Sequence, residues 1–175
     1  MDSCKFDEDP SILNLILDLE VVINCPVQAV WKHWLELGSW VLSHDVDTVH
    51  GVPGALGSVM RASNKRGAEL GMHISEVPLP HYHYCKIIKI VPEKVYVLKT
   101  FSEKGGSYGM DMAGFDQAKF ELIGEKTKIS YHYIGSYKSP KFIGGPFLKD
   151  PDDDDDHMLK NLLNLKRIVE ADWGA

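Results

Sequence analysis

Six titratable side chains fall on or near segments that we expect to form strands: His44, Asp45, Arg61, His73, Glu76 and His132. Proton transfer on an organic molecule needs one or two such groups inside an apolar pocket, where burial shifts their pKa values towards neutrality. His132 alternates with Tyr131 and Tyr133, so we expect it on the solvent side of its strand. The favoured interpretation is that all six are exposed or structural, and the catalytic residues are left unassigned.

The histidines and aspartates do not predict a metal site. His81 and His83 are two residues apart and would point the same way on a strand, but no spacing specifies the further ligands that zinc needs. The aspartate run at residues 152–156 lacks the alternating ligands and the glycine of an EF-hand loop, which favours a solvated helix start. The sequence has no Ser-His-Asp order, phosphate loop or dinucleotide fingerprint, so we expect no cofactor.

A long helix at the C-terminal end is the first element that must position these groups. Its apolar residues recur at steps of one or three, which places them on one helix face: Met158, Leu159, Leu162, Leu165, Ile168 and Val169. Aspartates precede this run and Lys166 and Arg167 lie towards its other end, as the helix dipole favours. About 20 residues of helix span roughly 30 Å, so the stripe predicts a broad partner.

The rest of the chain is predicted to be mainly strand. Residues 12–23 alternate between an apolar face and a polar face, which is typical of an antiparallel sheet with one wet side. Helical spacing over residues 27–35 ends near Gly38, and residues 39–44 form a second short helix or a turn. Further strands are expected over residues 45–51, 58–63, 70–77, 82–91, 95–102, 115–123 and 127–137. Residues 103–114 are expected to be a mobile loop, either a lid or a plain hairpin connection.

The composition limits the class of protein. A chain of 175 residues with 44% hydrophobic and 25% charged residues points to one soluble domain. The net charge of −6 and the lack of a basic patch make nucleic acid an unexpected partner. The three cysteines form no CxxC pair, and no signal peptide or membrane-length apolar run occurs. We therefore expect a cytoplasmic protein without stable membrane insertion.

Four local patterns resemble those of a known superfamily: INCPVQAVWKHW, GVPGALGSVMR, KIIKIVPEKVYVLKT and NLKRIVE. In this order they resemble the helix-grip fold of the START-like superfamily, which includes the polyketide cyclase/dehydrase group, lipid-transfer domains and birch-pollen-type allergens. The resemblance covers roughly residues 15–172. It implies an α+β fold in which a curved antiparallel sheet of about seven strands wraps around the long C-terminal helix, with two short helices after the first strand. We expect one domain over residues 12–173 and a flexible N-terminus over residues 1–11.

The resemblance also implies an apolar cavity between sheet and C-terminal helix that holds a small hydrophobic molecule, such as a lipid or a polyketide. Such cavities carry a few placed polar groups. Tyr131 and Tyr133 are the candidate polar anchors, and the alternative is that both are core aromatics bonded to backbone. Together with these tyrosines, the predicted ligand-binding residues are Trp34, Met60, Met72, Tyr96, Phe120, Leu159 and Leu162.

Three functions remain open from the sequence. Ligand binding without catalysis is the preferred interpretation. An enzyme of the cyclase, dehydratase or isomerase kind is the second. A protein-interaction module, as in START-like co-chaperone domains, is the third, and it would need a large exposed apolar or charged patch.

Overall fold

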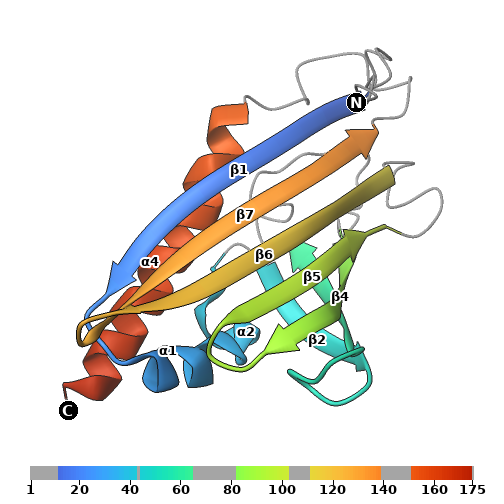
Figure 1. Ribbon diagram of the computed structural model, residues 1–175. Helices are drawn as coiled ribbons and strands as arrows, with labels where there is room; N and C mark the ends of the chain where they lie inside the picture. Colours follow the sequence, from blue (N-terminus) through green and yellow to red (C-terminus); the bar gives the residue numbers. More distant parts are fainter. Residues whose placement is uncertain (1–11, 43, 65–81, 103–110, 139–150, 175) are drawn as a thin grey trace, which may run out of the picture.

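The computed structural model describes residues 12–42, 44–64, 82–102, 111–138 and 151–174. Within these ranges a long first strand is followed by short helices, six more strands and a terminal helix (Figure 1). In chain order the elements are β1 (Ile12–Ile23), α1 (Val27–Trp34), α2 (Leu37–Trp40), β2 (His44–His50), β3 (Val59–Asn64), β4 (Tyr82–Val91), β5 (Val95–Phe101), β6 (Asp111–Ile123), β7 (Lys126–Lys138) and α4 (Pro151–Trp173).

The seven strands form one antiparallel sheet with the order β1-β7-β6-β5-β4-β3-β2. All neighbours except β1 and β7 are consecutive in the chain, so the sheet follows the chain order from β2 to β7, and β1 pairs with β7 (Figure 1). The tight β6–β7 turn uses Gly124 at a φ of 62°, a conformation that glycine adopts without steric cost. The first two strands of the chain therefore lie at opposite edges of the sheet.

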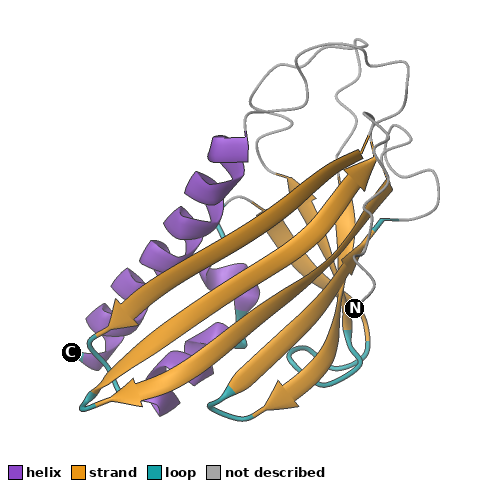
Figure 2. Cartoon of the chain, turned by 45° about the horizontal axis from the view of Figure 1, so that its top comes forward, coloured by secondary structure: helices purple, strands orange, loops and turns teal. Residues whose placement is uncertain are grey.

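One face of the sheet carries the core, because successive strand residues point to opposite sides. On β1 the buried positions are Leu17, Val21 and Ile23, while Ile16 and Val22 on the other face are exposed. The helix α4 lies along the sheet beside β1 and β7, and α1 and α2 cover the end where β1 finishes (Figures 1 and 2). The inward residues Leu162, Leu165 and Val169 of α4 are buried, which confirms the predicted face of this helix.

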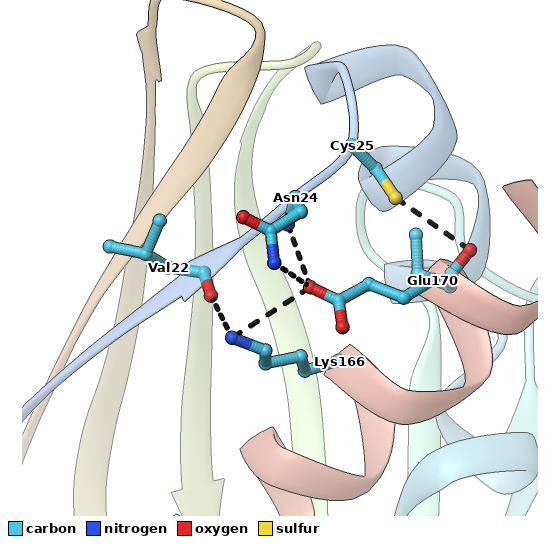
Figure 3. A network of polar contacts seen from close by, with 6 residues as sticks. Val22, Asn24, Cys25, Lys166 and Glu170 are labelled. Atoms are coloured by element: carbon cyan, nitrogen blue, oxygen red, sulfur yellow. Dashed lines mark hydrogen bonds and ion pairs between the residues drawn. The ribbon is translucent and has the colours of Figure 1, made fainter. Parts of the chain in front are cut away.

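Polar contacts fasten the C-terminal half of α4 to the end of β1 (Figure 3). The backbone N–H and the side-chain amide of Asn24 both donate to Glu170 Oε1, each over 2.8 Å. Lys166 Nζ donates to the Val22 carbonyl over 2.7 Å, which satisfies a backbone acceptor of an edge strand. The buried Cys25 thiol lies 3.8 Å from the Val169 carbonyl oxygen. The apolar stripe sets which face of α4 turns inward, and these contacts fix its position along β1.

The predicted architecture is confirmed, including the strand number, the two short helices and the long terminal helix. Two boundaries were wrong. The second short helix spans Leu37–Trp40, whereas the sequence placed a helix or turn over residues 39–44. Residues 111–114 belong to β6, whereas the sequence placed them in a loop. They extend the strand because they pair with β7 from Lys138 to Gly135. The predicted strand over residues 70–77 and the N-terminus over residues 1–11 lie outside the described residues. None of the described helices is long and apolar enough to cross a membrane.

Candidate functional site: a polar cluster on the inner face of the sheet

Four polar side chains from neighbouring strands meet on the inner face of the sheet, and we call them the Asp116 cluster: Cys85 (β4), Thr100 (β5), Asp116 (β6) and Tyr131 (β7). The Thr100 hydroxyl donates to Asp116 Oδ2 over 2.6 Å, and the Tyr131 hydroxyl donates to Asp116 Oδ1. Cys85 Sγ lies 3.7 Å from Thr100 Oγ1. The cluster is thus a continuous hydrogen-bonded chain that crosses four strands.

Strand alternation and register bring these residues together. Asp116 precedes the buried Ala118 by two positions, so both point inward. Ala118 is the register partner of Tyr131 on β7, and Cys85 is the partner of Thr100 across the β4–β5 ladder. Each member of the Asp116 cluster therefore sits at an inward position dictated by the pleat of its own strand.

Burial controls the electrostatics of the Asp116 cluster. It raises the pKa of Asp116, and the hydroxyls of Thr100 and Tyr131 oppose that rise by donating hydrogen bonds to the carboxylate. Burial and the nearby Asp116 charge raise the pKa of the Cys85 thiol to about 12. The same two causes raise the pKa of Tyr131 well above its usual value. Asp116 is therefore the member of the cluster that carries negative charge most readily.

Asp116 and two of its neighbours are only partly buried as residues. Asp116, Cys85 and Leu98, the register partner of Asp116 on β5, all keep an intermediate exposure on the inner face. Among the described residues, no lysine, arginine or histidine forms an ion pair with Asp116. The carboxyl group therefore has no neutralising cation within the described parts of the chain.

Aromatic side chains pack beside the Asp116 cluster. The ring of Trp34 lies 6.0 Å from that of Tyr96 and 5.1 Å from that of Phe120, both edge to face. Trp31 packs in the same way against Tyr96 and Phe120, which joins α1 to the sheet. Within the described residues, Trp34 Nε1 and the Tyr96 hydroxyl are buried without a hydrogen-bond partner. Buried donors of this kind are costly, and each is an exception that needs a physical reason.

Tyr133 lies over a pair of glycines that leave room for its ring. Gly114 and Gly135 are register partners on β6 and β7. A Cβ atom at Gly114 would lie 2.7 Å from the Tyr133 hydroxyl oxygen, and one at Gly135 would overlap the same ring. Neither glycine has a positive φ, so backbone conformation does not require glycine here. Both are needed because a larger residue would collide with the ring of Tyr133.

The structure gathers most of the predicted ligand-binding residues in one core. Leu159 is partly buried against it, and Met72 lies outside the described residues. The buried members are Trp34, Met60, Tyr96, Phe120, Tyr131, Tyr133 and Leu162. These residues pack together on the inner side of the sheet. That they contact a ligand stays a prediction. Neither tyrosine anchor was assigned a carboxylate partner from the sequence, yet Tyr131 bonds to Asp116.

None of the predicted acid–base candidates that the structure describes belongs to the Asp116 cluster. His132 faces outward and pairs with Asp18 over 2.6 Å, which confirms its predicted place on the wet face. Arg61 is exposed and pairs with Asp47, and Asp45 is exposed on β2. His44 lies on β2, with its ring 5.1 Å from that of His83. His73 and Glu76 lie outside the described residues.

Sequence reasoning missed Asp116, although a signal was present. The alternation of Ala118 and Phe120 continues backwards to Asp116 and Gly114. The predicted loop over residues 103–114 puts Asp116 at the very start of the expected strand, where its inward direction is not evident from the sequence. The described residues contain no group of three or more histidine, cysteine or acidic side chains arranged to hold a metal ion.

A small pocket lies at a different place, between the α1–α2 junction and the β2–β3 region. Its volume is about 230 Å³, which is below the usual range of ligand sites, about 300–1,000 Å³. Its lining combines Leu35, Leu37, Val46, Thr48, Pro53 and Met60 with Glu36 and small residues. Of the predicted ligand-binding set it contains Met60 alone, so it is not the cavity between sheet and C-terminal helix expected from the sequence.

The fold matches solved structures over nearly its whole length. A protein from Rhizobium leguminosarum has 16% identity and a TM-score of 0.64, and the match covers 91% of this chain and 97% of that one. Ara h 8.0201 has 13% identity, a TM-score of 0.58 and coverage of 91% and 99%. Norcoclaurine synthase from Thalictrum flavum, in complex with dopamine and hydroxybenzaldehyde, has 12% identity, a TM-score of 0.54 and coverage of 91% and 88%.

The chain therefore has the helix-grip fold of the START-like and birch-pollen-allergen-like proteins, as the resemblance in the sequence implied. No protein-family model matches the sequence, and no curated protein matches it either. Identities below 20% establish a shared fold and leave the activity to be argued from this chain's own residues.

Proposed function

We propose that this protein binds a small, mainly hydrophobic molecule on the inner side of its sheet, beside the Asp116 cluster. The observation that carries the proposal is the cluster itself, which is a buried hydrogen-bonded chain in an otherwise apolar wall. Ligand sites typically combine an apolar lining with a few polar groups that orient the ligand. The partial exposure of Asp116 and Leu98, side by side on β6 and β5, supports a recess at this point.

The comparison with norcoclaurine synthase supports a small organic molecule as the kind of ligand. That protein has this fold and was crystallised with dopamine and hydroxybenzaldehyde, two small aromatic molecules. The aromatic residues Trp31, Trp34 and Phe120 would give such a molecule an apolar surface beside the polar cluster here. A lipid or a polyketide, the ligands expected from the sequence, would also fit this proposal.

The test is a binding titration with a neutral fluorescent probe, N-phenyl-1-naphthylamine, on the wild type and two matched variants. Leu98→Trp would fill the inner side next to Asp116, and Lys99→Trp places the same bulk on the opposite face of β5. We expect saturable binding by the wild type and by Lys99→Trp, and at least about tenfold weaker binding by Leu98→Trp, which corresponds to about 1.4 kcal/mol.

Circular dichroism would confirm that both variants fold. Equal probe affinity in the two variants would contradict the proposed site. A wild type that binds no apolar probe and co-purifies with no small molecule in native mass spectrometry would contradict ligand binding altogether.

One observation favours a second candidate, acid–base catalysis on the bound molecule. Asp116 has a raised pKa and shares a hydrogen bond with Tyr131, so the pair could exchange a proton with a ligand. For an enzyme, Asp116→Asn should keep binding and lose conversion of any molecule that co-purifies with the wild type, followed by mass spectrometry. Unchanged conversion in Asp116→Asn would exclude this candidate.

A further inference from the structure

The hydrogen atoms of the Asp116 cluster can be assigned from its bonding pattern. An ionised carboxylate only accepts hydrogen bonds, and a hydroxyl group has a single hydrogen to donate. Thr100 and Tyr131 both bond to Asp116, so each uses its one hydrogen there. Thr100 Oγ1 can then only accept from the Cys85 thiol, which lies 3.7 Å away. When Asp116 is ionised, all hydrogens of the cluster consequently point along the chain towards the carboxylate.

What the cluster can offer to a ligand follows from this assignment. Tyr131 Oη and both Asp116 oxygens keep lone pairs, whereas neither hydroxyl group keeps a hydrogen. At Asp116 and Tyr131 themselves, a ligand therefore meets acceptors, and the nearest described donor without a partner is the hydroxyl group of Tyr96 beside them. A ligand group that accepts hydrogen bonds and cannot donate one, such as a carboxylate, would form no hydrogen bond with the oxygen atoms of Asp116 and Tyr131, so the lone pairs on both sides would stay unsatisfied.

The charge distribution of the neighbouring strands points the same way. The lysines on β4, β5 and β6 that lie near Asp116 in register occupy outward, exposed positions: Lys86, Lys99 and Lys119. Asp116 forms no ion pair within the described part of the chain. A buried anion without a cationic partner is unfavourable, and a positively charged ligand would relieve that cost.

We propose, on the basis of the proposed function, that the ligand is a hydrophobic amine whose protonated nitrogen donates to Asp116 and Tyr131. Its apolar part would contact inner-face side chains near the carboxylate, such as Leu98 on β5 and Leu19, the register partner of Tyr131 on β1. Asp116 then acts as the specificity-determining residue, because it is the charged group of the Asp116 cluster that selects the ligand's sign.

The test uses three molecules of the same shape, 4-phenylbutylamine, 4-phenylbutanol and 4-phenylbutyrate, and isothermal titration calorimetry at pH 7. A hydrogen bond to a charged group contributes about 1.5–3 kcal/mol, so the amine should bind the wild type at least about tenfold more tightly than the alcohol. The carboxylate should bind most weakly. Asp116→Asn should abolish the advantage of the amine over the alcohol, and the exposed Asp47→Asn should keep it.

Tyr131→Phe provides a second variant, since it keeps the charge and removes one acceptor. It should weaken amine binding several-fold and leave alcohol binding less affected. Equal affinity of the wild type for amine and alcohol, or an amine advantage that survives Asp116→Asn in a folded protein, would overturn the inference. If the neutral naphthyl probe still binds in that case, the proposed function stands and the inference alone fails. If no molecule binds, both fail.

Discussion

At the residue scale, the Asp116 carboxyl group sets the chemistry of the inner face. The hydroxyl groups of Thr100 and Tyr131 donate hydrogen bonds to it, and no described cation neutralises it. Burial therefore raises its pKa, and these two hydrogen bonds are what stabilises its charged form. The nearby Tyr96 hydroxyl is buried without a partner in the described ranges, which gives a natural contrast with Tyr131. The two tyrosines have the same side chain and opposite hydrogen-bonding states.

Replacing each tyrosine by phenylalanine measures this contrast. Tyr131→Phe removes a donor from a buried carboxylate and should lower the free energy of unfolding by about 1–3 kcal/mol. Tyr96→Phe removes a hydroxyl that makes no bond within the described residues, so it should leave stability unchanged or raise it by up to about 1 kcal/mol. Urea denaturation of both variants gives the comparison, and equal destabilisation would show that the Tyr96 hydroxyl has a partner.

The raised pKa of Asp116 predicts a pH-dependent stability. The native state keeps the Asp116 proton at pH values where the unfolded chain has lost it. The contribution of Asp116 is therefore fully present below the ordinary aspartate pKa of about 3.9 and is lost as pH rises through the raised native value.

The free energy of unfolding of the wild type should thus fall relative to that of Asp116→Asn as pH rises from about 3 to about 7. Urea melts of both proteins across this range provide the measurement. Parallel stability profiles would mean that burial does not perturb Asp116.

At the element scale, the apolar periodicity of the sequence predicts which face of a helix or strand turns inward, and other interactions set where the element begins and ends. Alternation and helical spacing predicted which faces of β1, β7 and α4 turn inward, because these depend on local periodicity alone. The start of β6 at Asp111 could not be predicted in this way. Its first residues pair with β7, and this long-range pairing outweighs the low strand propensity of a segment that contains Gly114.

The glycine pair under Tyr133 predicts a coupled mutational effect. Gly135→Ala places a methyl group where the Tyr133 ring lies and should destabilise the protein by about 1–3 kcal/mol through overpacking. In a Tyr133→Leu background the same change should cost clearly less, because the obstructing ring is gone. A double-mutant cycle from urea melts measures the coupling energy. Additive effects would show that the methyl group is accommodated by the backbone.

The contact between Glu170 and Asn24 predicts how firmly α4 is fastened to β1 (Figure 3). Glu170→Ala removes the acceptor of two hydrogen bonds at a partly exposed site and should cost about 1 kcal/mol. Glu121→Ala, on an exposed position of β6, is the matched control and should change stability by less than about 0.5 kcal/mol. Thermal melts distinguish the two, and the same loss in both variants would mean that the contact adds nothing.

At the scale of the whole molecule, α4 and the sheet stabilise each other through a shared core. The sequence predicted this arrangement because a long amphipathic helix and several half-apolar strands have few ways to bury their apolar faces. It did not predict where space for a ligand remains. A cavity depends on how side chains from distant strands meet, and periodicity does not contain that information.

The shared core makes one position on α4 decisive. Leu162 is 0% exposed and Leu163 next to it is 49% exposed. Leu162→Asp would bury a charge without a partner and should abolish cooperative folding, with a loss above about 4 kcal/mol. Leu163→Asp should change stability by less than about 1 kcal/mol. Circular dichroism melts test both, and a stable Leu162→Asp variant would show that α4 presents another face to the sheet.

The order of the strands also determines when the protein can fold during its synthesis. β1 is the first strand to leave the ribosome, and its ladder partner β7 is nearly the last. The nascent chain must therefore carry β1 without its ladder partner until β7 has been made. Closure of so long a loop is slow compared with local hairpin formation, so the β2–β7 hairpins are expected to assemble first and β1 to join them after translation has passed β7.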